Sequence, residues 1–301
     1  MTEFAHLPAT IRLGDLEVHR LGFGAMQLTG PGVWGEPRDP EQARAVLRRV
    51  VELGVNLIDT AWFYGPLVSN RLIAETLYPY PKGLVIATKL GGRRGPDASW
   101  LPGIRPEQLK EGCEEDLKSL RLERVDVAHL RWMPQNEVPF AEALDALIAL
   151  QKAGKIRHLA LSNVTMSEIE LALARTPIVA VQNLYNAAAG ESRLASVATH
   201  AAVEGQDRIL ALCESRGIAY LPFFPLAIPG APALPNAPLS QAAKRRGVSE
   251  SQIAVAWMLA RSRAFLPIPG TSSLAHLEEN VAARAIKLDA DEVAAISGAR
   301  G

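Results

Sequence analysis

The sequence predicts an α/β protein with a (β/α)8 barrel, the TIM-barrel fold, and two observations lead to this. Eight short apolar runs recur along the chain, each followed by a segment with helical periodicity or helix-start residues. Within the runs most positions are apolar instead of alternating with polar ones, which is typical of parallel strands covered by helices. Strand then helix, repeated eight times, closes into a barrel. The runs are residues 20–26, 55–61, 84–90, 125–132, 156–163, 178–185, 218–224 and 264–270.

Residues typical of helix starts and ends lie between the apolar runs, which is where a (β/α)8 barrel has its helices. Asp39 precedes Pro40, so the first helix begins with a capping residue and a proline at its first position, and Gly54 ends it. Pro106 opens the segment 106–120 in the same way. Capping boxes are predicted at Thr165 with Glu168 and at Ser249 with Gln252.

An open, doubly wound sheet is the alternative arrangement of the same elements. It favours a turn with G-x-G-x-x-G spacing after the first strand. Gln27 stands where the third glycine would be, so the closed barrel is the expected fold.

The chain, 1–301, is expected to form a single barrel domain with a short N-terminal hairpin and a C-terminal helical tail. Residues 187–206 are poor in large apolar side chains and lengthen the connection after the sixth strand. This insertion is either a lid over the site or a solvated helical segment. The proline-rich stretch 225–238 is expected to be a surface loop.

Composition excludes several kinds of partner. Lys plus Arg and Asp plus Glu number 32 each, without blocks of like charge, so we expect neither nucleic acid nor a membrane as partner. No stretch approaches the ~20 apolar residues that cross a bilayer, and no signal peptide is evident. We expect a cytoplasmic protein, a monomer or weak homo-oligomer, that acts on a small molecule. Cys113 and Cys213, without C-x-x-C spacing, are expected to be buried reduced thiols.

Charged residues end three consecutive predicted strands. Asp59, Lys89 and Arg131 close the second, third and fourth runs. Because the active site of this fold is built at the carboxyl ends of its strands, all three should face one mouth. A carboxylate beside an ammonium is compensated, which lets both tolerate apolar neighbours. The next two runs end in Ser162, Asn163 and Gln182.

Tyr64 follows Asp59 in the stretch NLIDTAWFYGP, residues 56–66. A free phenol is a weak acid at neutral pH, and a nearby ammonium favours its phenolate form. A tyrosine between Lys89 and a substrate carbonyl is therefore a candidate proton donor to an oxygen that becomes an alkoxide. A hydride donor must complete such a reduction.

These motifs together resemble the aldo-keto reductases, NADPH-dependent carbonyl reductases with a (β/α)8 barrel. The resemblance runs in order from about residue 11 to about residue 290, with an exception at the 187–206 insertion. The motifs that carry it are GFGAM, NLIDTAWFYG, VIATKL, LALSN, VQNLYN, PFFPL and IPGTSSLAHLEEN.

The resemblance implies catalytic roles for Asp59, Tyr64 and Lys89. The fourth member of the family's catalytic group is a histidine at the end of strand four, where this chain reads HLR and places Arg131. His129, two residues earlier, could supply the histidine only through a register shift. A true exchange of histidine for arginine resembles a subgroup that includes pyridoxal reductases. Arginine would stay charged and offer a planar fork of donors beside Tyr64.

The resemblance also implies a site for NADP(H), with NADPH preferred over NADH. Ser162, Asn163 and Gln182 would hold the carboxamide of the nicotinamide, Phe223 its ring, and Leu226 with the following loop the pyrophosphate. Gly270 and His276 replace the basic residues that many family members use on the 2′-phosphate, which leaves hydroxyls and backbone N–H groups for that role. The expected cofactor-binding residues are Gly24, Met26, Ser162, Asn163, Gln182, Phe223, Leu226, Gly270, Thr271, Ser272, Ser273, Glu279 and Asn280.

Four tryptophans, Trp34, Trp62, Trp100 and Trp132, follow the first four strands. They predict either an aromatic substrate pocket or ordinary loop packing. Tyr185 is a reserve candidate for ring stacking there.

We expect NADPH-dependent reduction of an aldehyde or ketone, such as pyridoxal or a specialised-metabolite carbonyl, without a metal. The alternatives are a cofactor-binding regulatory subunit with little turnover and a phosphate-binding lyase or isomerase on the same scaffold.

Overall fold

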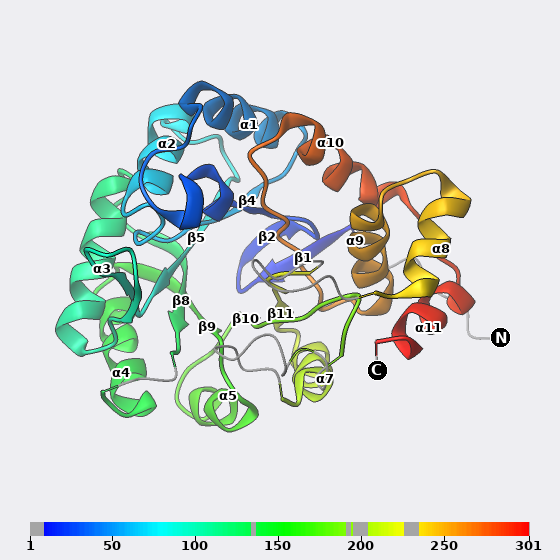
Figure 1. Cartoon of the computed structure of the whole chain (residues 1–301). Coiled ribbons are helices and arrows are strands. Elements are labelled where there is room, and N and C mark those ends of the chain that lie inside the picture. The colour runs from blue at the N-terminus through cyan, green and yellow to red at the C-terminus, as the bar shows by residue number, and fades with distance from the viewer. Residues whose placement is uncertain (1–8, 134–136, 191–193, 195–203, 226–234, 301) are drawn as a thin grey trace.

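The computed structural model describes residues 9–133, 137–190, 194, 204–225 and 235–300, which form a ring of helices around a curled parallel sheet (Figure 1). Seven strands lie in the order β11-β10-β9-β8-β5-β4-β3, and every neighbouring pair is parallel. These strands are β3 (Phe23–Gly24), β4 (Leu57–Asp59), β5 (Val85–Leu90), β8 (Val125–Arg131), β9 (Ile156–Ser162), β10 (Ala180–Gln182) and β11 (Ala219–Tyr220).

The eighth predicted strand closes the barrel as an extended segment. Tyr220 in β11 pairs with Phe265 through an isolated parallel bridge, and the Leu266 amide donates to the Tyr220 carbonyl at 2.9 Å. On the other side, the Gly22 amide donates to the Pro267 carbonyl at 2.9 Å. Proline has no N–H for a ladder, which explains why a regular strand is not formed here. The (β/α)8 barrel expected from the sequence is confirmed.

Helices flank the sheet, and several begin where the sequence predicts. Asp39 caps α1 by accepting a hydrogen bond from the Gln42 amide, and Thr165 and Ser249 form the predicted capping boxes of α5 and α9. The helices are α1 (Pro40–Glu52), α2 (Val68–Leu77), α3 (Pro106–Ser119), α4 (Phe140–Lys152), α5 (Met166–Leu173), α7 (Gln206–Arg216), α8 (Ala237–Arg246), α9 (Glu250–Arg261), α10 (Leu274–Ala282) and α11 (Ala290–Gly298), with 3-10 turns η1 (Ala25–Leu28), η2 (Pro31–Val33) and η3 (Ala283–Ala285).

Two small antiparallel hairpins lie outside the main sheet. The first, β1 (Thr10–Leu13) with β2 (Leu16–His19), buries Leu13 and Val18 against the interior of the barrel. The Asp15 carboxylate at its turn receives hydrogen bonds from Arg157 and contacts the His158 ring at 2.5 Å. The second, β6 (Gly92–Arg94) with β7 (Trp100–Pro102), follows β5 and stands at the mouth of the barrel.

Apolar side chains fill the space between sheet and helices. Cys113 and Cys213 belong to this core as free thiols, and burial raises the pKa of each to about 12. The prediction of buried, unpaired cysteines is confirmed. Within the described part of the chain, none of the helices combines the length and apolar character that a membrane crossing requires. Most of the 187–206 insertion lies outside the described residues, as do residues 226–234 of the proline-rich stretch.

Candidate active site

Three polar side chains from the predicted strand ends meet in direct contact. Lys89 Nζ donates to Asp59 Oδ1 and, at 3.1 Å, to the Thr60 carbonyl. Gln182 Nε2 donates to the other Asp59 oxygen at 2.9 Å. Asp59 and Lys89 are each 3% exposed, so the pair is buried and both charges are compensated. Burial opposes the charged form of Lys89, but Asp59 and Tyr64 outweigh it and raise the pKa of Lys89.

Tyr64 lies beside this pair and not in bulk solvent. Its side chain is 7% exposed, and Lys89 Nζ lies 5.1 Å from the centre of its ring. The loop after β4 turns sharply, because the Tyr64 amide donates to the Ala61 carbonyl at 3.0 Å and Leu67 donates to Trp62 at 2.6 Å. The Phe63 ring packs edge-on against Tyr64 at 5.4 Å. The turn therefore directs the phenol over the carboxyl ends of β4 and β5.

Arg131 ends β8 at the same mouth. Its Nη1 lies 3.5 Å from Ser162 Oγ, and its guanidinium carbon lies 5.6 Å from the centre of the Phe223 ring. Burial lowers the pKa of Arg131, and the nearby Tyr64 opposes that effect. No carboxylate of the described residues forms an ion pair with it. The guanidinium is thus a cation with donors left for a ligand.

His129 lies one layer deeper and does not replace Arg131. The ladder pairs Lys89 with His129 and Arg131 with Ser162. His129 is 0% exposed, and its Nδ1 lies 3.1 Å from the Thr88 carbonyl. Burial lowers the pKa of His129 to about 4, so the ring is neutral at pH 7. The register shift that would bring this histidine to the mouth does not occur.

Two adjoining cavities open beside Tyr64. The first, about 620 Å³, is mostly apolar apart from Lys89, Arg131, Gln182 and the tyrosine itself. Its other lining residues are Met26, Gly32, Val33, Phe63, Gly92, Trp100, Met133, Phe223 and Phe224.

The second cavity, about 470 Å³, extends from Tyr64 toward the starts of α9 and α10. Eight of the residues expected to bind cofactor line it: Gly24, Met26, Gln182, Phe223, Gly270, Thr271, Glu279 and Asn280. Its lining also contains Gln27, Asp59, Phe224, Pro225, Ser249, Ser251, Ile268, Pro269 and His276. Ser249 and Ser251 were missed because the only sequence signal of Ser249 is the capping box of α9, and Ser251 belongs to no motif.

Four expected cofactor residues are not in the lining of this cavity, and one is not described. Ser162 is fully buried, and its carbonyl accepts from the Trp132 amide at 2.8 Å. Asn163 adopts a left-handed backbone, φ 60°, and its Nδ2 donates to the Trp132 carbonyl at 2.8 Å. Ser273 caps α10, and its amide donates to Thr271 at 3.0 Å. Ser272 is likewise not part of the described lining, and Leu226 lies outside the described residues.

The expected cluster of pocket tryptophans is corrected by the structure, since only Trp100 lines the cavity among the described residues. Trp62 packs against α3, where a Cβ on Gly112 would lie 2.7 Å from its indole nitrogen. Trp132 packs edge-on against Phe140 of α4 at 5.1 Å. Trp34 faces the Arg94 guanidinium at 5.3 Å. Trp62 and Trp132 thus pack against the helices that follow their strands, and Trp34 packs against the β6–β7 hairpin.

Tyr185 is also corrected. It is fully buried outside both cavities, where its hydroxyl contacts Asp207 and accepts from Arg261 Nε at 2.9 Å. Burial raises the pKa of Tyr185 to about 12. Its ring belongs to the core between barrel and helices, so it cannot stack on a substrate.

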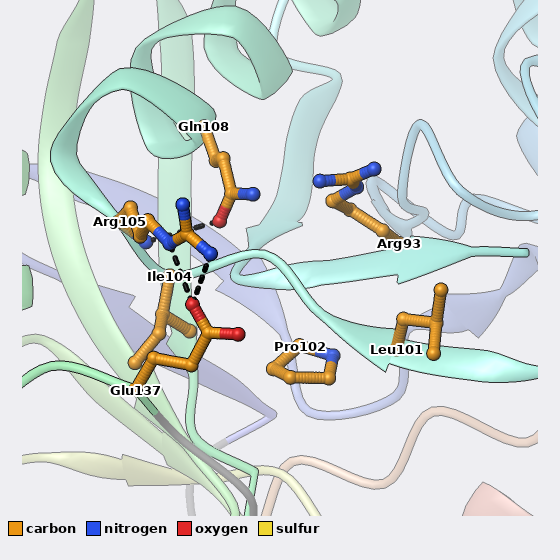
Figure 2. A pocket seen from close by; sticks show the side chains of 7 residues that line it. All are labelled: Arg93, Leu101, Pro102, Ile104, Arg105, Gln108 and Glu137. Carbon is orange, nitrogen blue, oxygen red and sulfur yellow. Dashed lines mark hydrogen bonds and ion pairs between the residues drawn. The ribbon is translucent and has the colours of Figure 1, made fainter.

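A smaller cavity of about 190 Å³ lies near the β6–β7 hairpin (Figure 2). Its charges are largely satisfied internally, because Arg105 Nε donates to Glu137 at 2.6 Å and the Arg105 amide donates to Gln108 at 3.2 Å. It shares no lining residue with the other two cavities. Throughout the described residues, no group of His, Cys, Asp or Glu is arranged to hold a metal ion.

A (β/α)8 barrel whose mouth joins two cavities at a buried Asp–Lys pair and a tyrosine is typical of enzymes that bring two small molecules together. The sequence profile of the Aldo/keto reductase family matches residues 20–300, and the chain belongs to that family. The expected family is confirmed.

Two curated relatives cover nearly the whole chain. Pyridoxine 4-dehydrogenase of Escherichia coli is 44% identical over 294 residues, with 96% of this chain and 97% of the relative covered. An uncharacterized oxidoreductase of Schizosaccharomyces pombe is 42% identical, with 94% and 87% covered.

Solved structures show the same fold. A thermostable aldo-keto reductase bound to the inhibitor epalrestat superposes with a TM-score of 0.77 at 26% identity, covering 96% of this chain and 99% of the other. An aldo/keto reductase from Klebsiella pneumoniae in complex with NADP and acetate has a TM-score of 0.75 at 23% identity, covering 96% and 94%.

Proposed function

We propose that this protein reduces an aldehyde or ketone to an alcohol with NADPH, and that Tyr64 donates the proton. The observation that carries the proposal is the position of Tyr64, which lines both cavities beside the buried Asp59–Lys89 pair. A cofactor in the cavity toward α9 and α10 and a carbonyl compound in the other would then meet at the phenol. Family membership supports the same reaction class.

The residues have separate roles in the proposed reaction. The nicotinamide, when bound, supplies the hydride to the carbonyl carbon. Tyr64 transfers its hydroxyl proton to the carbonyl oxygen, and Lys89 stabilises the negative charge left on the phenol. Asp59 keeps Lys89 charged and oriented despite burial. Arg131 holds the oxygen while charge develops on it.

Phe223 and Phe224 line both cavities and would exclude water where the two ligands meet. In the cofactor cavity, the polar groups away from Tyr64 include those of residues 270–280 and of the start of α9. Backbone N–H groups and hydroxyls at two helix starts suit a phosphate, which supports NADP(H) as cofactor even without a basic residue at Gly270.

We further propose an aromatic aldehyde with an acceptor oxygen beside the carbonyl as substrate. Three observations support this: an apolar cavity with Phe63, Trp100 and Phe223 in its lining, the Arg131 guanidinium without an ion pair among the described residues, and the relative named for pyridoxine. Pyridoxal, whose ring hydroxyl neighbours the aldehyde, has this chemistry. The guanidinium fork can hold both oxygens.

Turnover of a carbonyl panel by the wild type and by Tyr64→Phe tests the function. We expect NADPH oxidation with pyridoxal and benzaldehydes, and a loss of about 10²- to 10⁴-fold in kcat for the variant, since a general acid contributes this much. Binding of NADPH, followed by its fluorescence, should change by less than about threefold because the ring remains. Tyr78→Phe is the control, because Tyr78 is 49% exposed and does not line either cavity.

NADPH binding without turnover of any carbonyl would instead identify a cofactor-binding regulatory protein. Turnover that survives in Tyr64→Phe would refute the proposed role of the tyrosine.

A further inference from the structure

A buried polar cluster beside the candidate active site has no part in the mechanism above. Its centre is Asp116, on the inner face of α3, with a side chain that is 0% exposed. One carboxylate oxygen accepts a hydrogen bond from Asn70 Nδ2 at 2.7 Å, and the other accepts from Thr88 Oγ1 at 2.8 Å. Both oxygens are thus held by neutral donors from two different elements, α2 and β5.

Burying this carboxylate costs free energy that a hydrophobic side chain at the same position would not cost. Burial raises the pKa of Asp116 to about 7, although Thr88 and Asn70 both lower it. Replacing buried polar groups by well-packed apolar ones is often neutral or stabilising. Asp116 therefore contributes little to the stability of α3. The hydrogen-bond partners of Asp116 indicate which part of the structure it positions.

Both partners lead directly to the Asp59–Lys89 pair. Thr88 is the residue before Lys89 on β5, so its side chain fixes the strand at that point. Asn70 Oδ1 accepts from Thr60 Oγ1 at 2.8 Å, and the Thr60 carbonyl accepts from Lys89 Nζ at 3.1 Å. Asp116 is thus linked to Lys89 by two routes, one through Thr88 and the other through Asn70 and Thr60.

The same cluster holds the loop that carries Tyr64. Ser69 Oγ lies 2.9 Å from Thr60 Oγ1, and the Ser69 amide donates to the Tyr64 carbonyl at 3.2 Å. Asn70 also donates to Ser119 Oγ at 3.0 Å, which ties the start of α2 to the end of α3. The loop after β4 is therefore fixed at both ends through side chains that converge on Asp116.

We propose that Asp116 is a positioning residue of this active site, which holds Lys89 and Tyr64 in register through Thr88, Asn70 and Thr60. The inference rests on the proposed reductase function. A displacement of a general acid by a fraction of an ångström lowers the rate of the chemical step while leaving the cofactor cavity intact.

Asp116→Leu removes the hydrogen bonds while keeping the same branched side-chain skeleton, and Asp116→Asn is the conservative variant. Asn can keep the cluster connected, because the Asn70 amide can flip and the hydroxyls of Thr60 and Thr88 can reverse their direction. Leu109→Val on the same helix is the matched control, since Leu109 is fully buried and has an apolar side chain that takes no part in the hydrogen bonds of the cluster. The measurements are the single-turnover rate of NADPH oxidation with an aldehyde, the Kd of NADPH from fluorescence, and Tm.

We expect Asp116→Leu to lower the single-turnover rate at least tenfold, with the Kd of NADPH changed less than twofold, and Asp116→Asn to stay within about threefold of wild type. Thr60→Val cuts the same chain next to Lys89 and should show the same pattern if Asp116→Leu does not fold. A rate for Asp116→Leu, or for Thr60→Val in its place, within twofold of Leu109→Val would overturn the proposal, and so would equal losses in Asp116→Asn and Asp116→Leu. If the wild type reduces no carbonyl compound, the proposed reductase function is refuted. That result differs from the two outcomes that would refute only the role of Asp116.

Discussion

At the scale of single residues, Arg131 sets this chain apart from the histidine expected at the end of its fourth barrel strand. A neutral imidazole offers one N–H donor, whereas a guanidinium offers five donors and a permanent charge. Arg131 contacts Ser162 and the Phe223 face but no carboxylate of the described residues. Its remaining donors support the proposed recognition of an acceptor oxygen beside the substrate carbonyl.

The prediction for Arg131 concerns preference between substrates. Wild type should reduce 2-hydroxybenzaldehyde with a higher kcat/KM than benzaldehyde, by about tenfold, because a charge-assisted hydrogen bond contributes roughly 1.5 kcal/mol or more. Arg131→Met should remove this preference, and its kcat/KM for the hydroxylated compound should fall further than for benzaldehyde. An equal fall for both aldehydes would show that the arginine does not recognise the adjacent oxygen.

His129 makes the stability of the fold sensitive to acid. Its pKa is about 4 in the folded chain, against 6.5 for an unperturbed histidine, because of burial. The unfolded chain therefore binds more protons between these values, and the free energy of unfolding falls as pH drops from about 6.5 to about 4. The difference amounts to at most about 3 kcal/mol at the acid end.

The test is the variant His129→Phe, which cannot titrate. The free energy of unfolding of the variant minus that of wild type should be higher at pH 4.5 than at pH 7 by about 2 kcal/mol or more. Urea denaturation at both pH values measures this difference. A constant difference at the two pH values would mean that folding does not shift the pKa of the ring.

At the scale of elements, strand ends were predictable and loop directions were not. Asp59 and Lys89 meet because adjacent parallel strands bring their carboxyl ends to one edge, which follows from sequence order alone. Trp62 and Trp132 also follow strands, but their side chains turn toward helices α3 and α4. That direction depends on the turn of each loop and on the neighbouring helix, which no local pattern encodes.

The β1–β2 hairpin yields a prediction about its glycine. Gly14 has φ +65°, and a Cβ there would lie 2.3 Å from Cε1 of His158, whereas Gly154 has φ +75° with nothing within 4 Å. Alanine at either position costs about 1 kcal/mol through the left-handed backbone. Gly14→Ala should cost clearly more, because His158 must also leave the Asp15 carboxylate. Denaturant midpoints of both variants measure the difference, and equal losses would refute the contact.

At the scale of the whole molecule, barrel closure depends on a seam without a regular ladder. Arg20 is 5% exposed, and its guanidinium donates to the carbonyls of Phe265 at 3.3 Å, Leu259 at 3.2 Å and Ser262 at 2.5 Å. Burial lowers the pKa of Arg20 to about 10, which still leaves it charged at neutral pH. One side chain thus joins the first strand to the segment that completes the ring.

Arg20→Met should therefore destabilise the fold by roughly 3 kcal/mol, because it removes three hydrogen bonds from a charged donor and leaves buried carbonyls unpaired. Urea unfolding measures this. The control is Arg12→Met on the exposed face of β1, which should change the free energy of unfolding by less than about 0.5 kcal/mol. Similar values for the two variants would show that the seam is held by packing alone.

The barrel, its strand order and the convergence of Asp59, Lys89 and Gln182 were predictable from the amino-acid sequence. Periodicity and chain order can be read locally, and parallel topology converts them into position. Three features became visible only in the folded chain: Tyr64 lines both cavities, Tyr185 and three tryptophans lie elsewhere, and Asp116 links α3 to α2 and β5. The reason is physical: these outcomes depend on side-chain direction and on contacts between residues far apart in the chain, such as Asn70 and Asp116, and such contacts leave no periodic signal in the sequence.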